Sequence, residues 1–128
     1  MRGEEGVRFV IEIEVQDVPM FKEIVARCVD ATRTEPGTLV YDWYLDEETG
    51  KARLYEAFES IDAVQVHMTG PVFTDVGLEM PQCSKFIHVD AFGEFDNLGF
   101  RPQYWPTSWW GSAFASLAQP PSNPGAPD

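Results

Sequence analysis

The chain of 128 residues has the length of a single domain built on one hydrophobic core. Its residues are 44% hydrophobic and 13% aromatic, which is too apolar for a disordered chain, yet no apolar run approaches the roughly 18 residues that a membrane span needs. The formal net charge of −12 repels phosphate backbones and anionic lipid headgroups, so the composition disfavours nucleic-acid and membrane partners. Two acids near the start, where a secretory signal has a basic stub, predict a cytoplasmic protein.

Cysteine and histidine are both scarce. Cys28 and Cys83 are far apart and have no CxxC spacing, which favours two buried thiols over a disulfide framework or a zinc site. His67 and His88 are not joined by the spacing of a metal-binding helix, and the sequence has no glycine-rich phosphate loop. We therefore expect neither a metal nor an organic cofactor.

The first two predicted elements are a strand and a helix. Residues 7–15 alternate apolar and polar side chains, as in a strand with one buried face. Asp17 can cap a helix, Pro19 fits its first turn, and apolar residues then recur at helical spacing to about Arg33. Glu35-Pro36-Gly37 ends this helix.

A hairpin and a second helix follow. Residues 38–45 and 52–59 are rich in β-branched and aromatic side chains and flank a polar loop containing Gly50, which predicts two antiparallel strands. Ser60 is a good helix cap, and the helix that it begins runs to about Met68.

The last predicted elements complete the fold. Residues 72–78 suggest a short helical piece, and residues 85–95 alternate as a fourth strand. The order β-α-β-β-α-β is that of an α+β, ferredoxin-like sheet with its helices on one face. We assign residues 1–95 to this domain and residues 96–128 to a C-terminal arm, which holds six of the ten prolines. The aromatic residues of the arm are Phe100, Tyr104, Trp105, Trp109, Trp110 and Phe114.

The sheet needs a second cover. Helices can shield one face only, while the strands at 38–45 and 85–95 carry apolar side chains on both faces. Two copies packed sheet against sheet would cover the open sheet face of both subunits at once, so we expect a homodimer. Three alternatives are open for the arm: a lid over the pocket, a strap on the partner subunit, or a cover for a sheet edge.

Three short motifs in the middle of the chain carry a family resemblance. They are Glu35-Pro36-Gly37 before a strand that bears Tyr41, the strand end Glu56-Ala57-Phe58-Glu59, and His67 shortly before Pro71-Val72-Phe73. In this order, and over about residues 7–93, the chain resembles the antibiotic biosynthesis monooxygenase family.

The resemblance implies a dimeric α+β barrel with a pocket between the sheet and the helices of each subunit. Members include cofactor-independent oxygenases of aromatic polyketides and quinols, and haem-degrading enzymes. The chain has Phe58 where the family often has Trp, and Ile11 where the haem-degrading branch has Asn. Both differences weigh against haem degradation.

His67 and Glu56 are the candidate catalytic residues. His67 shares a helical stripe with apolar residues that should face the sheet, and its imidazole can exchange a proton near neutral pH. Glu56 has the strand parity of Phe58, so both face the same side, and a carboxylate against apolar walls can act as a base. The alternatives are a core histidine bonded to a backbone carbonyl, and a carboxylate paired with a cation across the dimer.

Five further residues are candidates for substrate contact. Aromatic clefts with a few polar groups are typical small-molecule sites, although each residue could instead belong to the barrel core or the dimer interface. The candidates are Tyr41, Trp43, Tyr55, Phe58 and Ile11.

We therefore expect a homodimeric, cofactor-independent monooxygenase that acts on a small aromatic molecule of the polyketide or quinol type. The base would deprotonate a phenol, and the anion would react with O₂ without flavin or metal. The same base and cavity would serve a cyclase, an isomerase or a decarboxylase. A non-catalytic protein that binds a small molecule is the alternative outside enzymes.

Overall fold

The computed structural model of the chain describes residues 6–93 and 113–118. The strands are β1 (Val7–Val15), β2 (Thr38–Asp46), β3 (Lys51–Phe58) and β4 (Ser84–Gly93). The helices are α1 (Val18–Thr32), α2 (Ile61–Met68), a π-helical turn η2 (Val72–Val76) and the short α3 (Met80–Cys83). The predicted β-α-β-β-α-β order is confirmed, with η2 at the predicted short helical piece and α3 as an additional turn before β4.

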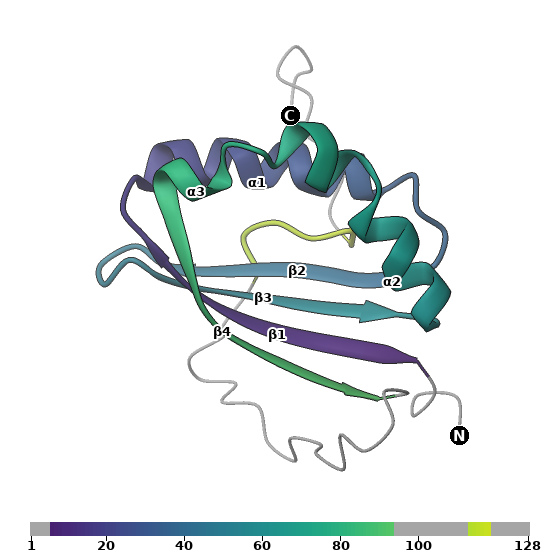
Figure 1. Cartoon of the computed structure of the whole chain (residues 1–128). Coiled ribbons are helices and arrows are strands. Elements are labelled where there is room, and N and C mark those ends of the chain that lie inside the picture. The colour runs from purple at the N-terminus through teal and green to yellow at the C-terminus, as the bar shows by residue number, and fades with distance from the viewer. Residues whose placement is uncertain (1–5, 94–112, 119–128) are drawn as a thin grey trace.

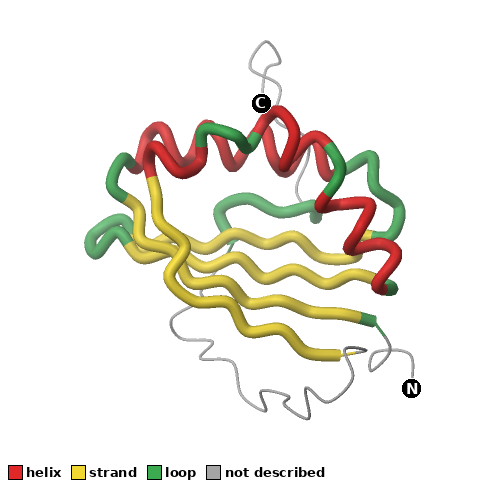
Figure 2. The backbone as a smooth tube through the Cα atoms, viewed as in Figure 1, coloured by secondary structure: helices red, strands yellow, loops and turns green. Residues whose placement is uncertain are grey.

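The four strands form one antiparallel sheet in the order β2-β3-β1-β4. All of the helices lie on one side of this sheet, as the red and yellow layers of Figure 2 show, with α1 running along it and α2 at one end (Figure 1). This is the ferredoxin-like α+β fold expected from the sequence.

Both principal helices begin at the predicted caps. The Asp17 side chain accepts a hydrogen bond of 3.0 Å from the backbone N–H of Met20, and Ser60 Oγ accepts one of 3.1 Å from Ala63. Each cap satisfies an N–H that the first helical turn leaves free. The chain thus enters each helix at a fixed residue.

The connection between α2 and β4 differs in detail from the prediction. The helical piece expected at residues 72–78 is the π-helical turn η2, and the additional turn α3 precedes β4, which begins at Ser84. The pairing of β1 with β4 shifts register between Glu12 and Ile13, which marks a bulge on this edge of the sheet. The predicted strand extended to Phe95, and that end lies outside the described residues.

The main core lies between α1 and the sheet. Phe21, Ile24 and Val25 of α1 are fully buried and belong to the same apolar cluster as Tyr41 and Trp43 of β2. The rings of Phe21 and Trp43 meet edge to face, with centroids 5.8 Å apart. The apolar side chains that recur at helical spacing on α1 therefore pack against the inward-facing side chains that alternate along β2.

No helix in the described part of the chain is long and apolar enough to cross a membrane.

Residues 113–118 lie along the free edge of β2 (Figure 1). The backbone of Trp43 donates to Ala115 O at 2.8 Å and accepts from Phe114 N at 2.9 Å. The Phe114 ring packs on Phe21, and Lys22 Nζ lies 5.9 Å from its centroid. This part of the predicted arm covers a sheet edge. The other five aromatic residues of the arm lie outside the described residues.

Candidate active site

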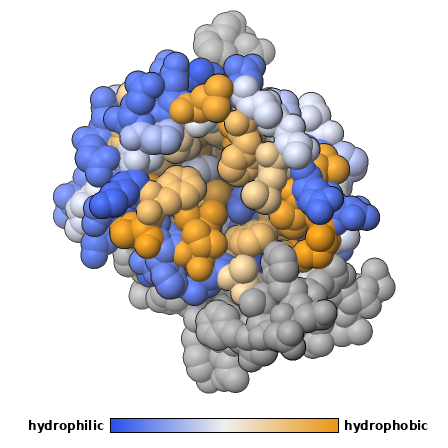
Figure 3. All heavy atoms as spheres, viewed as in Figure 1, coloured by the Kyte–Doolittle hydropathy of each residue, from blue (hydrophilic) through white to orange (hydrophobic). Residues whose placement is uncertain are grey.

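A cavity of about 740 Å³ lies between the sheet and the helices. In the space-filling view the molecule is hollowed here, and hydrophobic side chains gather around the hollow (Figure 3). Its lining is mostly apolar and includes a buried carboxyl group and a buried imidazole, those of Glu56 and His67. The residues that line it are Ile11, Gln16, Cys28, Tyr41, Trp43, Leu54, Glu56, His67, Val72, Phe73, Gly77, Leu78, Met80, Pro81, Ser84, Lys85 and Phe86.

Five of the seven residues proposed from the sequence line this cavity. The strand register brings these residues together. Glu56 of β3 pairs with Tyr41 of β2, and two positions away Leu54 of β3 pairs with Trp43 of β2 on one side and Ile11 of β1 on the other. Residues at every second position of neighbouring strands point to the same side of a sheet. The five are Ile11, Tyr41, Trp43, Glu56 and His67.

The other two proposed residues do not line it. Phe58 lies behind the imidazole of His67, with ring centroids 5.3 Å apart, so it supports the histidine from outside the cavity. Tyr55 precedes Glu56 in β3 and therefore points to the opposite side of the sheet, where its hydroxyl accepts a hydrogen bond of 3.2 Å from Arg8 Nε. We remove Tyr55 from the candidate site for this reason.

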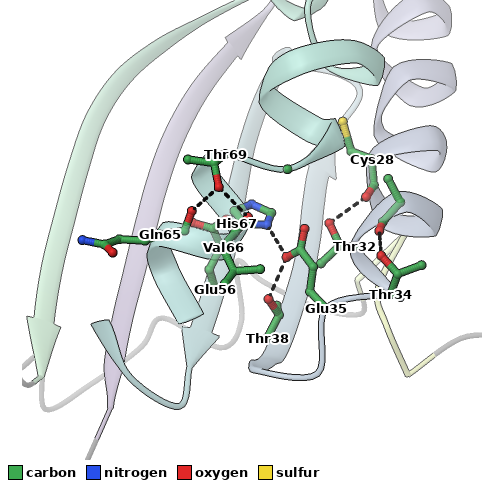
Figure 4. Close-up of polar contacts among 12 residues, drawn as sticks. Cys28, Thr32, Thr34, Glu35, Thr38, Glu56, Gln65, Val66, His67 and Thr69 are labelled. Carbon is green, nitrogen blue, oxygen red and sulfur yellow. Dashed lines mark hydrogen bonds and ion pairs between the residues drawn. The ribbon is translucent and has the colours of Figure 1, made fainter. Parts of the chain in front are cut away.

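His67 lies between two buried carboxylates (Figure 4). Its Nδ1 is 2.7 Å from Glu35 Oε1, and its Nε2 is 3.4 Å from Glu56 Oε2. All three side chains are at most 8% exposed. Thr38 Oγ1 donates to the same Glu35 oxygen at 3.0 Å. The histidine is therefore bonded to side chains and not, as one alternative supposed, to a backbone carbonyl.

Local sequence places each member of the cluster. His67 lies on the face of α2 that also buries Ala63 and Val64, so helical spacing turns it toward the sheet. Strand alternation turns Glu56 to the same side. Glu35 follows the end of α1, where its backbone N–H donates to Thr32 O at 3.0 Å. Three separate elements thus converge on one imidazole.

The carboxylates control the charge of His67. Burial of the ring lowers its pKa, but hydrogen bonding and charge from Glu56 and then Glu35 raise it, and the balance holds the pKa above the ordinary 6.5. His67 is therefore more readily protonated than a free histidine. The protonated ring can donate from both nitrogens.

Two other titratable residues of the cavity are held neutral. Burial raises the pKa of Tyr41 well above 10, and the charges of Cys28 and Glu56 add to this effect. Burial also raises the pKa of the Cys28 thiol to about 12, although Arg27 opposes the change. Tyr41 can donate a hydrogen bond but cannot act as a base, and Cys28 is not an activated nucleophile.

Sequence reasoning missed Glu35 as a member of the site. Glu35 belongs to the Glu35-Pro36-Gly37 motif, which indicated the end of a helix and carried part of the family resemblance but gave Glu35 itself no role in the site. The signal that was available is an acid inside a motif shared with the family. Sequence spacing gave no reason to place it beside His67, 32 residues away along the chain.

Within residues 6–93 and 113–118, no group of three or more histidine, cysteine or acidic side chains is arranged to hold a metal ion. In the Glu35–His67–Glu56 cluster, both ring nitrogens face carboxylate oxygens. The described donor set is therefore suited to sharing protons.

The fold has been seen in other proteins. SnoaB from Streptomyces nogalater, described as a cofactor-independent oxygenase and solved as a mutant, matches with a TM-score of 0.61 and 17% identity over 75% of this chain and 99% of that one. A conserved protein from Methanosarcina mazei Go1 matches with a TM-score of 0.65 and 17% identity over 72% and 95%. MupZ from Pseudomonas fluorescens matches with a TM-score of 0.62 and 15% identity over 70% and 72%.

At such identities these likenesses establish the fold alone. Comparison with curated proteins finds no significant match. The family model described as antibiotic biosynthesis monooxygenase matches residues 7–76, which is more than half of the chain and includes Glu35, Glu56 and His67. The chain therefore belongs to the antibiotic biosynthesis monooxygenase family.

Proposed function

We propose that the protein is a cofactor-independent monooxygenase acting on a small, planar, phenolic or polycyclic molecule of the polyketide or quinol type. The observation that carries the proposal is the Glu56–His67 pair in the wall of an otherwise apolar cavity. A volume of about 740 Å³ lies in the range of small-molecule sites. The fold shared with SnoaB, an oxygenase of this class by its description, supports the same reaction type.

The pair can remove a proton from a bound phenol. When His67 is protonated, the Glu56 carboxylate is the group that can accept the proton, and the imidazolium stabilises the resulting anion. Above the pKa of His67, its Nε2 can accept the proton directly. The long Nε2–Glu56 distance of 3.4 Å leaves both groups able to turn their hydrogen bonds to a substrate oxygen.

The anion then reacts with O₂. It passes one electron to O₂, and the two radicals combine to form a carbon–oxygen bond. Loss of water from the resulting peroxide converts a ring CH₂ to a carbonyl, so one oxygen atom enters the product and the other leaves as water. The protein contributes the proton acceptor and an apolar surrounding that excludes bulk water.

The mouth of the cavity suits a flat apolar substrate. Phe73, Leu78 and Phe86 line the cavity and are also about half exposed, at 50%, 61% and 48%. Exposed aromatic and aliphatic side chains around an opening favour the entry of an apolar ring. Phe73 also meets the imidazole of His67 edge to face at 5.5 Å, so the opening leads to the titratable pair.

The same proposal includes a homodimer. Ile87 and Val89 of β4 are about half exposed, although they are apolar strand residues. A second copy packed against β4 and the sheet would cover them with an interface well above about 1,000 Å², the size of a stable association. Light scattering at micromolar concentration should give twice the chain mass, and a monomer mass would remove this part of the proposal.

The reaction is tested by oxygen consumption. Purified protein, treated with a chelator, is mixed with 1,8-dihydroxyanthrone, and O₂ uptake and formation of the anthraquinone are measured against the spontaneous rate. We expect His67→Gln to lower the catalysed rate by about 10²–10⁴, the usual contribution of a proton-transfer group. His88→Gln is the matched control because His88 is exposed and does not line the cavity.

Other outcomes would decide between the remaining functions. A product formed without O₂ uptake would replace oxygenation with cyclisation, isomerisation or decarboxylation at the same base. Saturable binding of the probes with no turnover would make the protein a binding module. An equal loss of activity in both histidine variants would contradict the role of the Glu56–His67 pair.

A further inference from the structure

We propose that Glu35 is a positioning residue of this site, which holds the Nδ1 edge of His67 so that Nε2 is the nitrogen turned toward Glu56 and the substrate. This inference rests on the proposed function only in taking the cavity as the place of reaction. It assigns a task to a residue that makes no contact with the cavity itself.

The first argument is that the two carboxylates differ in their position relative to the cavity and in their distance from His67. Glu56 and His67 are part of the cavity lining, and the described lining does not include Glu35. Glu35 Oε1 lies 2.7 Å from Nδ1, a short contact typical of charge-assisted hydrogen bonds, while Glu56 Oε2 lies 3.4 Å from Nε2. The tight bond is therefore on the far edge of the ring and the loose one is on the cavity edge.

The second argument concerns where the ring proton lies. An ionised carboxylate oxygen only accepts hydrogen bonds, and Glu35 Oε1 already accepts from Thr38 Oγ1 at 3.0 Å. Nδ1 must then carry a proton to bond with it. Because one ring nitrogen determines the state of the other, neutral His67 presents the lone pair of Nε2 to the cavity, and protonated His67 presents Nε2–H. The neutral ring can therefore accept a proton at Nε2, and the protonated ring can donate one from the same atom.

The third argument is that Glu35 is held on a rigid turn. Its backbone N–H donates to Thr32 O at 3.0 Å, and its carbonyl accepts from Thr38 N at 3.2 Å. Gly37 packs so closely on α2 that an added Cβ would lie 2.6 Å from the Cβ of Ala63. The turn is thus fixed against the same helix that carries His67, which keeps the two side chains in register.

The charged and titratable groups that face His67 come from three elements. They are Glu35 from the turn after α1, Glu56 from β3, and Tyr41 from β2, whose ring centroid lies 5.3 Å from that of the imidazole. Tyr41 stays neutral because its pKa is raised, so the two carboxylates set the charge around the ring. Replacing Glu35 removes one of these two charges and leaves Glu56 in place.

The test is a tautomer measurement by NMR on the full chain with ¹⁵N-labelled histidine. The chain has two histidines, and His88→Gln assigns their signals. We expect neutral His67 to carry its proton on Nδ1. His88 is an internal reference of the opposite kind, because its Nε2 lies 2.8 Å from Asp90 Oδ1 and should hold the proton there. A wild-type His67 protonated on Nε2 when neutral would overturn the proposal without any variant.

Variants of Glu35 provide the second measurement. In Glu35→Gln the amide oxygen can still accept from Nδ1, so the tautomer should persist while the titration midpoint of His67 falls, because one carboxylate charge is gone. In Glu35→Ala both the tautomer preference and the raised midpoint should be lost. Asp62→Asn is the matched control, since Asp62 is an exposed acid in the first turn of the same helix. An unchanged midpoint in Glu35→Gln, or the same change in Asp62→Asn, would contradict the role of Glu35.

Activity separates this inference from the proposed function. In the oxygen-uptake assay Glu35→Gln should lower kcat and shift its pH profile while KM for the anthrone stays nearly constant, because Glu35 does not touch the substrate. If no variant or wild type consumes O₂ but the NMR result holds, the oxygenase proposal fails and the positioning of His67 stands. If turnover depends on His67 and is indifferent to Glu35→Gln, the role of Glu35 fails alone.

Discussion

Two histidine–carboxylate pairs in this molecule have nearly the same length and opposite surroundings. His67 Nδ1 lies 2.7 Å from Glu35 Oε1, and His88 Nε2 lies 2.8 Å from Asp90 Oδ1. The first two side chains are 3% and 5% exposed, and the second two are 58% and 39% exposed. Water screens the second pair and not the first, so burial rather than distance decides what each pair contributes.

The difference also explains why only one pair is a candidate for chemistry. Around His67, aromatic rings of Tyr41, Phe58 and Phe73 lie within 5.5 Å between centroids, and a second carboxylate closes the cluster. The exposed pair is formed by neighbouring positions on one face of β4. A proton held by His67 interacts with fixed protein charges, whereas one held by His88 interacts largely with solvent.

Removing each histidine should give the largest contrast. His67→Ala leaves Glu35 and Glu56 buried without the imidazole between them, and we expect the free energy of unfolding at pH 7 to fall by about 3–5 kcal/mol. His88→Ala is the control and should lose at most about 1 kcal/mol. Urea unfolding followed by tryptophan fluorescence measures both, and equal losses would remove the distinction between the two pairs.

The pH dependence of stability should sharpen the comparison. The folded pKa of His67 lies above its unfolded value of 6.5, so the stability gained from its charge is complete below pH 6.5 and is lost as the pH rises through the folded pKa. Wild-type protein should therefore be less stable at pH 9 than at pH 6. In His67→Gln this part of the decrease should disappear, and a pH profile identical to that of the wild type would contradict the assignment.

A smaller effect is expected at Thr38. Thr38→Val keeps the shape of the side chain and removes the hydroxyl that donates to Glu35 Oε1, which should cost about 1–2 kcal/mol because the acceptor is a buried carboxylate. Thr34→Val is the matched control, since Thr34 is exposed and its hydroxyl donates to the carbonyl of Ala31 within the same turn. Thermal or urea unfolding of the two variants should separate them, and a larger loss in Thr34→Val would reverse the argument.

The exposed pair should show the smallest effect. A double-mutant cycle with His88→Ala and Asp90→Asn should give a coupling energy of less than about 1 kcal/mol that decreases further in high salt. A coupling of several kcal/mol that resists salt would contradict the exposed, water-screened setting of this pair.

Most of the fold could be predicted from the sequence because its signals are local. The caps Asp17 and Ser60, the helical stripe of α1 and the alternation of β1 each depend on a few neighbouring residues. The short helix α3 and the exact start of β4 could not be predicted, because Met80–Cys83 is held by the packing of Met80 and Cys83 in the core and not by a local pattern.

The candidate site was predictable in part for the same reason. Helical spacing turned His67 inward and strand parity aligned Glu56 with Phe58, which are properties of single elements. Strand parity also argues against Tyr55, whose neighbour Glu56 has the opposite orientation. The contact of Glu35 with His67 is a tertiary one, formed by the docking of the turn after α1 on α2, and no periodicity within either element contains it.

Trp43 contacts both the cavity and the C-terminal residues 113–118, through different atoms. Its indole forms part of the cavity wall, while its backbone N–H and carbonyl are hydrogen-bonded to residues 113–118. A strand edge fixed in this way cannot drift without moving the side chain that it carries. The width of the cavity therefore depends on residues 113–118, which do not line it, and a truncation that removes these residues should change the shape of the cavity.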